Sequence, residues 1–265
     1  MLLTIATKQA YAYTGGKPFD ARLPTVVFIH GAQCDHSVWI LQSRYLAHHG
    51  YGVLAVDLPG HGRSAGPALA SVEDMADWIA AVLDAAGVQQ ARLIGHSMGS
   101  LIALETSARH PARIARIALL ATAYPMKVSE QLLTATRDDE AQAQDMVNIW
   151  SHLAYAQYPN NPGPGFWVMG ENLRLMQRQK PGVMHVDFSA CNAYTGGEAA
   201  AAKVGCPALF VIARRDVMTA ARSAQAFAQT VKGARAVMIE GSGHNMMGEK
   251  PDDVLDALVA FLHQP

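Results

Sequence analysis

The stretch ARLIGHSMGSLIALE, residues 91–105, decides how the rest of the chain is interpreted. Its first part, ARLIG, is a short apolar run typical of a buried strand, and SLIALE favours a helix. Between them, GHSMG matches the pattern G-x-S-x-G, in which a sharp strand-to-helix turn exposes the serine hydroxyl, here that of Ser97. Side chains at positions 95 and 99 would collide with neighbouring backbone, which gives Gly95 and Gly99 a steric reason. Because the chain has 22 glycines, a chance match is easy, and the motif needs support from its surroundings.

Apolar runs of strand length recur on both sides of this motif and alternate with helical patterns. The expected strands lie at residues 25–30, 52–60, 91–97, 115–122, 208–216 and 236–244, and YAYTG (11–15) reads as an antiparallel edge. Helical patterns occupy residues 38–50, 71–87 and 100–111. This alternation predicts an α/β fold with a mostly parallel central sheet flanked by helices on both faces.

The alternation is interrupted once, between Tyr124 and Gly205. About 80 residues there carry helical patterns without a convincing strand, and NNPGPG (160–165) reads as a loop. The sequence therefore predicts a helical insertion into the α/β domain.

Composition excludes several classes of function. Half of the 265 residues are hydrophobic, 16% are charged and the formal net charge is −1, so neither nucleic acid nor a membrane is expected as a partner. Three widely spaced cysteines suit reduced thiols, and with no signal peptide or membrane span in the sequence we expect a cytoplasmic protein. No CxxC, HExxH or Walker pattern occurs, so no metal or cofactor is predicted.

A nucleophilic serine needs a base, and the base needs an orienting acid. On a sheet of this kind the acid and the histidine follow the serine in that order, each after a later strand. Asp216 follows the run ALFVIARR and His244 follows AVMIEGSG. The backbone N–H groups of Met98 and of Ala32, in FIHGAQ, are the candidate donors to an oxyanion.

Together, HG (30–31), DLPGHGRS (57–64), GHSMG (95–99), Asp216 and GSGH (241–244) resemble the motifs of the α/β-hydrolase fold. The resemblance is to its cap-bearing group of esterases, lactonases and carbon–carbon hydrolases. It implies a core at residues 1–123 and 201–265 and a helical cap at 124–200, inserted after the sixth strand. It also implies structure-forming roles for His30 and His61.

The chain departs from many relatives at Ser100, where they have glycine, and we expect a slight change of helix packing there. Dehalogenases and epoxide hydrolases of this fold carry aspartate where this chain has Ser97, which excludes their chemistry.

Some residues have competing interpretations. Asp57 precedes Ser97, the wrong order for the triad acid, and is read as loop-forming, whereas Asp187 in HVDF is an alternative acid. Arg174 and Arg178, one helical turn apart, either bind a substrate carboxylate or form a solvated face. Four side chains are candidates for the substrate pocket: His96, Trp150, Trp167 and Met169.

These residues predict a serine hydrolase that cleaves a small carboxylic ester, lactone or thioester through an acyl-enzyme intermediate. The substrate is expected to be a small molecule with an apolar part. Carbon–carbon hydrolysis of meta-cleavage-type diketones, acyl transfer to an alcohol, perhydrolysis and non-catalytic binding of a small ligand remain alternatives. The sequence leaves the natural substrate and the oligomeric state open.

Overall fold

The computed structural model describes residues 1–157 and 167–263. Within these residues the strands form one eight-stranded sheet in the order β1-β2-β4-β3-β5-β6-β7-β8. The first two strands pair antiparallel, and the pairs from β4 to β8 are parallel. The prediction of a mostly parallel sheet is confirmed. The strands are β1 (Leu2–Ile5), β2 (Lys8–Tyr13), β3 (Thr25–Ile29), β4 (Gly52–Val56), β5 (Ala91–His96), β6 (Ile114–Leu120), β7 (Ala208–Ala213) and β8 (Arg235–Ile239).

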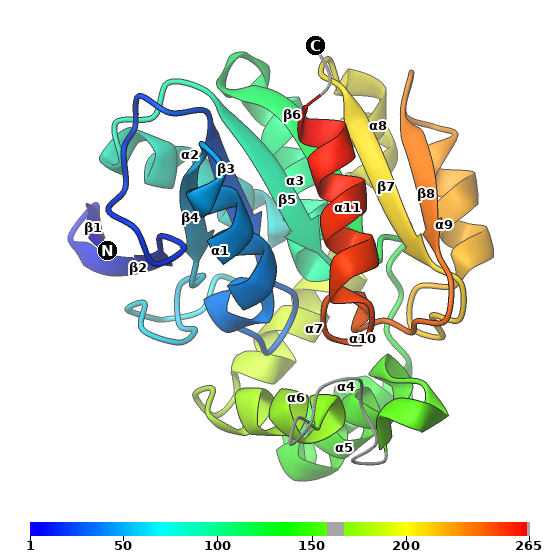
Figure 1. The fold of residues 1–265 in the computed structure, drawn as a ribbon. Helices are drawn as coiled ribbons and strands as arrows, with labels where there is room; N and C mark the ends of the chain where they lie inside the picture. The colour runs from blue at the N-terminus through cyan, green and yellow to red at the C-terminus, as the bar shows by residue number, and fades with distance from the viewer. Residues whose placement is uncertain (158–166, 264–265) are drawn as a thin grey trace.

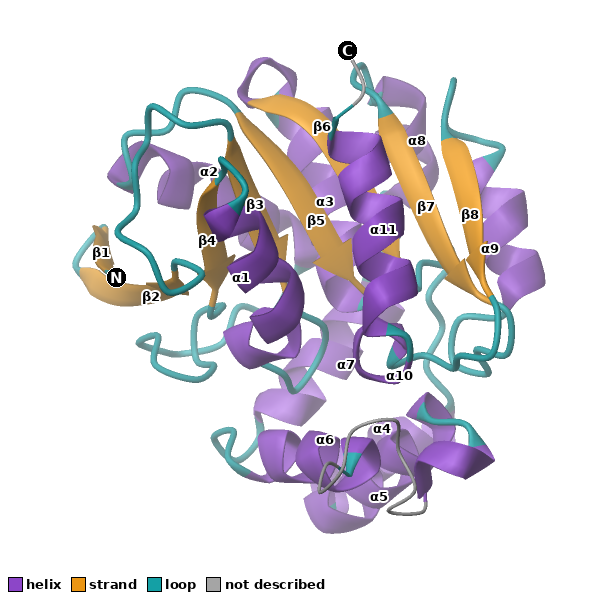
Figure 2. Cartoon of the chain, viewed as in Figure 1, coloured by secondary structure: helices purple, strands orange, loops and turns teal. Residues whose placement is uncertain are grey.

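Helices cover both faces of the sheet (Figures 1 and 2). Alternate side chains of β3 pack into two different clusters, Val27 and Ile29 on one face and Val26 and Phe28 on the other. Both clusters are apolar, which explains why this strand reads as a continuous apolar run. The helices of the core are α1 (Ile40–His48), α2 (Val72–Ala85), α3 (Met98–Arg109), α8 (Gly197–Lys203), α9 (Ala221–Ala228), α10 (Met246–Glu249) and α11 (Pro251–Leu262), with 3₁₀ turns η1 (His36–Trp39) and η2 (Pro111–Arg113).

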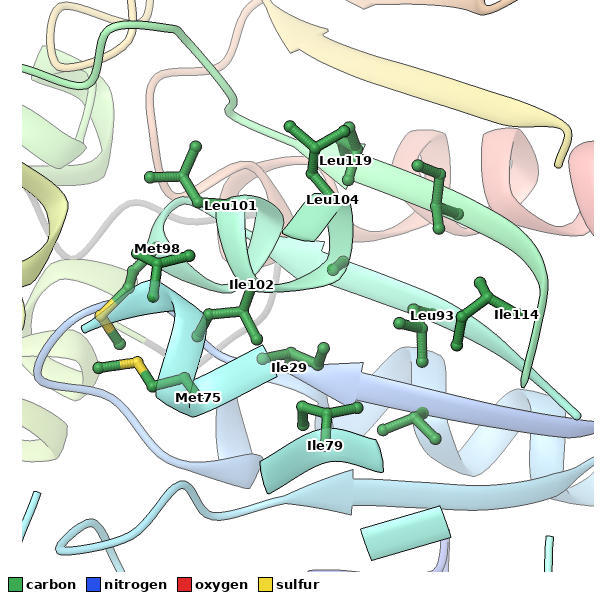
Figure 3. Close-up of a cluster of buried hydrophobic side chains, with 14 of the residues drawn as sticks. Ile29, Met75, Ile79, Leu93, Met98, Leu101, Ile102, Leu104, Ile114 and Leu119 are labelled. Carbon is green, nitrogen blue, oxygen red and sulfur yellow. The ribbon is translucent and has the colours of Figure 1, made fainter. Parts of the chain in front are cut away.

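The helix α3, which begins directly after Ser97, lies in the centre of the larger cluster. Its Leu101, Ile102 and Leu104 are fully buried, together with Leu93 of β5 (Figure 3). Burying a side chain of this size contributes about 1.5 to 3 kcal/mol each. The start of α3 is thus held rigidly against the sheet.

Five α-helices lie between β6 and β7 in the described part of the chain, and the first four of them lie beyond the carboxyl ends of the strands (Figure 1). We call these helices, α4 (Glu130–Asp138), α5 (Glu140–Ser151), α6 (Val168–Gln177) and α7 (Val183–Ala193), the cap; the 3₁₀ turn η3 (Ala154–Gln157) lies between α5 and α6. Leu132, Met176 and Phe188 belong to a small apolar cluster of the cap's own. The following helix α8 instead packs against α3, with Ala200 in the main core. We therefore propose that the cap ends before α8 rather than at residue 200.

Two expectations from composition can be compared with the structure. All three cysteines, Cys34, Cys191 and Cys206, are unpaired, as reduced thiols would be. Among the described residues, no helix has the length and apolar character that crossing a bilayer requires.

Candidate active site

The turn between β5 and α3 holds Ser97 in a backbone conformation that residues other than glycine rarely adopt. Its φ is 53° and its ψ is −119°, and its N–H donates to the carbonyl of Leu120, 2.9 Å away. A Cβ atom on Gly95 would lie 2.0 Å from the carbonyl oxygen of Gly99, and one on Gly99 would lie 2.3 Å from that of Ile29. Both glycines are therefore required by the turn, for the steric reason that the sequence suggested.

Ser100, the departure from the usual glycine, lies fully buried in the first turn of α3. Its hydroxyl donates to the carbonyl of Ser97 at 2.5 Å, and its N–H donates to the same oxygen at 2.8 Å. The extra hydroxyl therefore has a partner in the turn itself, and it ties the helix start to Ser97.

His244 and Asp216 lie next to each other on the loops after β8 and β7. The Nδ1 atom of His244 is 2.8 Å from Oδ2 of Asp216, so this carboxylate can fix the imidazole with Nε2 free. The hydroxyl of Thr219 donates to the same oxygen at 2.6 Å, and the N–H groups of Met218 and Thr219 donate to Oδ1 at 2.8 Å each. Burial alone would raise the pKa of Asp216, but His244 and the hydrogen bonds of Thr219 outweigh it and leave that pKa below its usual value. Asp216 is thus built to stay ionised beside the histidine.

Ser97 and His244 both line two adjoining cavities under the cap. One has a volume of about 370 Å³ and the other of about 40 Å³, and both also contain Ala32, Phe188 and Met218 in their walls. Among the described residues the Ser97 hydroxyl has no hydrogen bond to His244, as is common before a substrate is bound. The serine and the histidine nevertheless face the same space, at the junction of a large and a small cavity.

Of the two residues whose backbone amides are proposed as oxyanion donors, Ala32 lines both cavities and Met98 directly follows Ser97 in the chain. Met98 is the first residue of α3, where N–H groups have no partner within the helix, and Ala32 follows directly after Gly31. A Cβ on Gly31 would lie 3.2 Å from the Cβ of Ser97, so this loop passes close to the serine. No described residue accepts a hydrogen bond from the amide of Ala32 or of Met98. Both donors are therefore available to a bound group.

The structure brings two of the four pocket candidates to the cavities and leaves two outside. His96 lines the small cavity and Trp150 lines the large one. Burial lowers the pKa of His96 to about 3, so this imidazole is neutral, and its Nε2 donates to the carbonyl of His244 at 2.9 Å. Trp167 is 46% exposed, and the carbonyl of Met169 accepts a hydrogen bond from the side chain of Asn148. Neither residue is among those that line these cavities.

The two arginines of the cap have protein partners. Arg178 donates to both carboxylate oxygens of Asp35, at 2.8 and 2.9 Å, and to the hydroxyl of Ser37. The Nη1 atom of Arg174 donates to the amide oxygen of Gln177 at 2.8 Å. These contacts make Arg178 a link between the cap and the loop before α1, not a free site for a substrate carboxylate.

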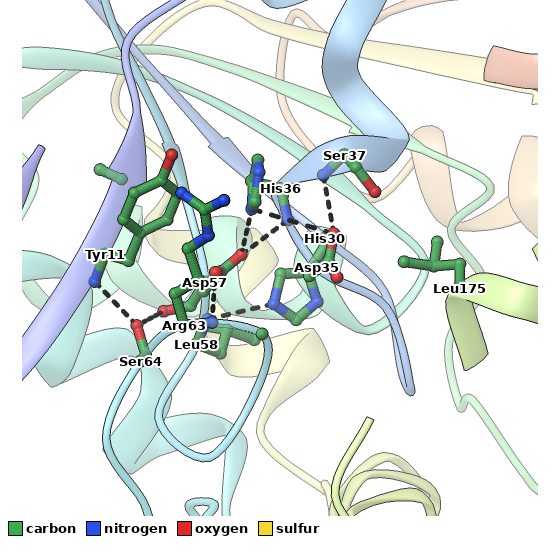
Figure 4. Close-up of polar contacts among 12 residues, drawn as sticks. Tyr11, His30, Asp35, His36, Ser37, Asp57, Leu58, Arg63, Ser64 and Leu175 are labelled. Carbon is green, nitrogen blue, oxygen red and sulfur yellow. Dashed lines mark hydrogen bonds and ion pairs between the residues drawn. The ribbon is translucent and has the colours of Figure 1, made fainter. Parts of the chain in front are cut away.

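The two competing acids lie elsewhere. The carboxylate of Asp57 accepts hydrogen bonds from the N–H groups of His36 and Arg63, each at 2.8 Å, and so organises the loop after β4 (Figure 4). Asp187 contacts His61 and the N–H of Gln33, both at 2.8 Å. The recorded acid partner of His244 is Asp216.

One group of possible metal ligands occurs among the described residues: Asp35, His36 and Asp57, with ligand atoms within 4.8 Å of one another. Both carboxylates already accept hydrogen bonds from backbone amides and side chains. These bonds hold the surrounding loops together, which accounts for the clustering of the three residues without a metal.

Some residues of the site were missed by sequence reasoning. Thr219 lies three positions after Asp216, a distance at which an aspartate often accepts from the backbone N–H, and this spacing was a signal that the sequence offered. Glu249 accepts hydrogen bonds from the N–H of Gly243, beside His244, and of Leu153 after α5, at 2.6 and 2.8 Å. The apolar walls formed by Phe188 and Met218 carry no local sequence signal.

Comparison with known proteins agrees with this geometry. Residues 24–251 match the family described as alpha/beta hydrolase fold. The chain belongs to this family. (E)-2-((N-methylformamido)methylene)succinate hydrolase of Acinetobacter baylyi is 28% identical over 248 residues, which cover 89% of each chain. A bifunctional esterase/perhydrolase of Acinetobacter calcoaceticus is 27% identical over 94% of this chain and 95% of that protein.

Among solved structures, an enol-lactonase from Burkholderia xenovorans superposes on this member of the family with a TM-score of 0.88. The two share 22% of their residues, and all of each chain is covered. At this identity the likeness shows the fold, and the chemistry must be argued from the residues of this chain.

Proposed function

We propose that this α/β-hydrolase-fold protein is a serine hydrolase that cleaves a small carboxylic ester, lactone or thioester through an acyl-enzyme intermediate. The observation that carries the proposal is the pair of cavities that Ser97, His244 and Ala32 all line, together with backbone amides at Ala32 and Met98 that have no partner among the described residues. His244 is in turn bonded to Asp216. These are the parts that acyl transfer to a hydroxyl requires.

In the proposed reaction, the Oγ atom of Ser97 attacks the carbonyl carbon while Nε2 of His244 takes its proton. Asp216 holds the imidazole and stabilises the imidazolium. The amides of Ala32 and Met98 donate to the oxyanion. His244 then gives its proton to the leaving group, and a water molecule hydrolyses the acyl-enzyme by the same sequence of proton transfers.

The cavities support a substrate with two unequal halves. The large one, about 370 Å³, is lined mainly by apolar side chains such as Leu132, Trp150 and Phe188, and Lys127 lies in its wall. The small one, about 40 Å³, has room for a group of one or two carbon atoms. We infer an ester with one short and one larger, mostly apolar substituent.

The test is hydrolysis of p-nitrophenyl acetate and butyrate by the wild type and by Ser97→Ala. We expect Ser97→Ala to lower kcat/KM by at least about 10³-fold, because the substitution removes the proposed nucleophile. Ser107→Ala, near the far end of α3, removes a buried hydroxyl that bonds only within its own helix, and it should keep wild-type activity. Activity that survives in Ser97→Ala would refute the proposed nucleophile.

The alternatives use the same residues and are separated by substrate. A panel of lactones, thioesters and vinylogous diketones, with hydrogen peroxide or an alcohol as acceptor in parallel reactions, identifies the bond that is cleaved and the acceptor. A wild type that turns over nothing in the panel but binds a member of it would favour a small-ligand-binding protein.

A further inference from the structure

Asp187, on helix α7 of the cap, is fully buried and reaches across to the core. Its Oδ2 accepts hydrogen bonds from the N–H of Gln33 and from Nε2 of His61, each at 2.8 Å. The other ring nitrogen of His61 lies 3.1 Å from the carbonyl oxygen of Pro59. Both partners of this imidazole are acceptors, so the geometry favours an imidazolium that donates from both nitrogens. The proposed mechanism uses neither member of this buried ion pair.

The contact to Gln33 matters because of where this residue lies in the chain. Gln33 directly follows Ala32, whose amide is the proposed oxyanion donor. On the other side of Ala32, the carbonyl of Gly31 lies 2.8 Å from Nδ1 of His30. The N–H of Leu58 donates to Nε2 of the same ring at 3.1 Å, so Nδ1 carries the proton and donates to Gly31 (Figure 4). Burial lowers the pKa of His30 to about 4, which agrees with a neutral ring.

The two peptide groups on either side of the Ala32 α-carbon are thus each held by a buried side chain. In a planar trans peptide the N–H points away from the C=O, so fixing the Gly31 carbonyl also fixes the direction of the Ala32 amide. Asp187 fixes the next peptide group through its N–H. With both planes held, the backbone angles at Ala32 are determined, one by the core and one by the cap.

The loop would not keep this shape unaided. Gln33 has a φ of 56°, in the left-handed region that residues other than glycine occupy only at a cost in free energy. Its side-chain amide donates to Glu140 of α5 and to the carbonyl of Met176 of α6, each at 3.1 Å. Among the described residues, all three hydrogen-bond partners of Gln33, including Asp187, therefore belong to the cap.

The charge balance also fits a role beside an oxyanion. An unpaired buried carboxylate next to the site would repel the negative charge that develops on the substrate oxygen. The His61 imidazolium neutralises Asp187, so the carboxylate can hold the loop without opposing the reaction. Burial would lower the pKa of His61, but the charge and hydrogen bond of Asp187 outweigh it and leave that pKa above its usual value.

We propose that Asp187 is a positioning residue through which the cap holds the Ala32 amide in place for the oxyanion. The inference rests on the proposed function, since it assigns Asp187 a task in that reaction. A positioning role differs from a purely structural role in one respect: loss of Asp187 should weaken binding of the transition state more than binding of the ground state.

The experiment compares wild type, Asp187→Asn and Tyr194→Phe. In Asp187→Asn one oxygen can still accept from Gln33 and His61, but it carries no negative charge, so both hydrogen bonds are weaker than those to the carboxylate. We call residues 31–33, which include the proposed donor Ala32, the oxyanion loop. Tyr194, at the end of the same helix, donates a hydrogen bond to Glu105 of α3, so Tyr194→Phe removes a bond between α7 and the core that does not involve this loop. Asp187→Glu, which keeps the charge opposite His61 but adds a methylene, takes the same test if Asp187→Asn does not fold.

Each protein is assayed for kcat/KM on p-nitrophenyl butyrate and for inhibition by an alkyl trifluoromethyl ketone and its methyl ketone analogue. The trifluoromethyl ketone accepts the Oγ atom of Ser97 at its carbonyl carbon, its oxygen becomes the oxyanion, and the serine proton passes to His244. The methyl ketone stays a ketone and reports binding of the ground state. Thermal unfolding gives the stability of each variant.

For Asp187→Asn we expect kcat/KM and the affinity for the trifluoromethyl ketone to fall together by about tenfold. This is less than the 10² to 10³ that complete removal of an oxyanion donor costs, and methyl ketone affinity should stay within about twofold. Tyr194→Phe should be less stable but keep the wild-type ratio of the two affinities. Equal loss of both affinities, or unchanged kinetics in a destabilised Asp187→Asn, would overturn the inference. A wild type that neither hydrolyses the ester nor binds the trifluoromethyl ketone would instead refute the proposed function.

Discussion

Three buried histidines should make this fold sensitive to mild acid. Burial lowers the pKa of His30 and of His152 to about 4 and that of His96 to about 3, against about 6.5 in an unfolded chain. His30 accepts a hydrogen bond from a backbone amide and His152 accepts one from Asn245, so protonation breaks a bond as well as burying a charge. Below pH 6.5 these histidines become protonated in the unfolded chain but stay neutral in the folded one. The free energy of unfolding therefore decreases as the pH falls towards 4.

The size of the effect follows from these pKa values. Between pH 7 and pH 5 each histidine destabilises the fold by about 2 kcal/mol, which gives about 6 kcal/mol for the three. His61 acts in the opposite direction, because its raised pKa makes its contribution fully present below pH 6.5, and it offsets part of this loss. A loss of this order is comparable with the total stability of many domains.

The measurement is the free energy of unfolding by urea at several pH values between 7 and 5. His152→Gln, whose amide can also accept from Asn245, should reduce the pH dependence by about 2 kcal/mol over this range, or a third of the histidine effect. His48→Gln, at an exposed position, should leave it unchanged. If the free energy of wild type changes by less than about 1 kcal/mol, or if His152→Gln retains the full pH dependence, the reasoning is wrong.

Two further substitutions test the geometry of the site. Thr219→Val removes the hydroxyl that donates to Asp216 and keeps the backbone amide, so we expect kcat/KM on p-nitrophenyl esters to fall about three- to tenfold with little change in melting temperature; unchanged kinetics would show that the hydroxyl is dispensable. Gly95→Ala places a Cβ 2.0 Å from a backbone oxygen and should cost about 3 kcal/mol or more of stability, measured by urea unfolding, whereas Gly205→Ala, with no heavy atom within 4 Å of the added carbon, should be tolerated. A stable, active Gly95→Ala variant would contradict the structure of the turn.

The sequence predicted those features that depend on local rules. Buried strands read as continuous apolar runs, and the steric need for Gly95 and Gly99 follows from the shape of one turn. The predicted order of serine, acid and histidine places Asp216 beside His244 because the carboxyl ends of parallel strands meet at one edge of the sheet. The catalytic roles of these residues remain predictions that the kinetic tests address.

The features that depend on how the cap packs were not predictable. Trp150 and Trp167 look alike in the sequence, yet one lines the large cavity and the other is half exposed. Asp187 was an alternative to Asp216 as the acid beside His244, but its partners are His61 and the backbone of Gln33, which lies 154 positions earlier. Such distant pairs follow from tertiary packing, for which a single sequence gives no periodicity and no motif.

The cap has two kinds of contact with the candidate site, and substitutions at the two kinds should have different effects on activity. Asp187 binds the oxyanion loop, and the C-terminal end of α5 binds the loop after β8 that carries His244, where the carbonyl of Ser151 accepts from the N–H of Asn245 at 2.9 Å. Leu132 and Trp150 instead contribute side chains to the wall of the large cavity. Substitution at these two positions can alter which acyl or alcohol group fits, while the bonds that hold the catalytic loops stay intact. We expect substitution at the first set to change the rate for every substrate, because it acts on the proposed oxyanion donor and the proposed base, which all substrates would share. Substrate range is therefore expected to vary through the cavity wall, and catalytic power through the buried polar contacts between the cap and the two loops.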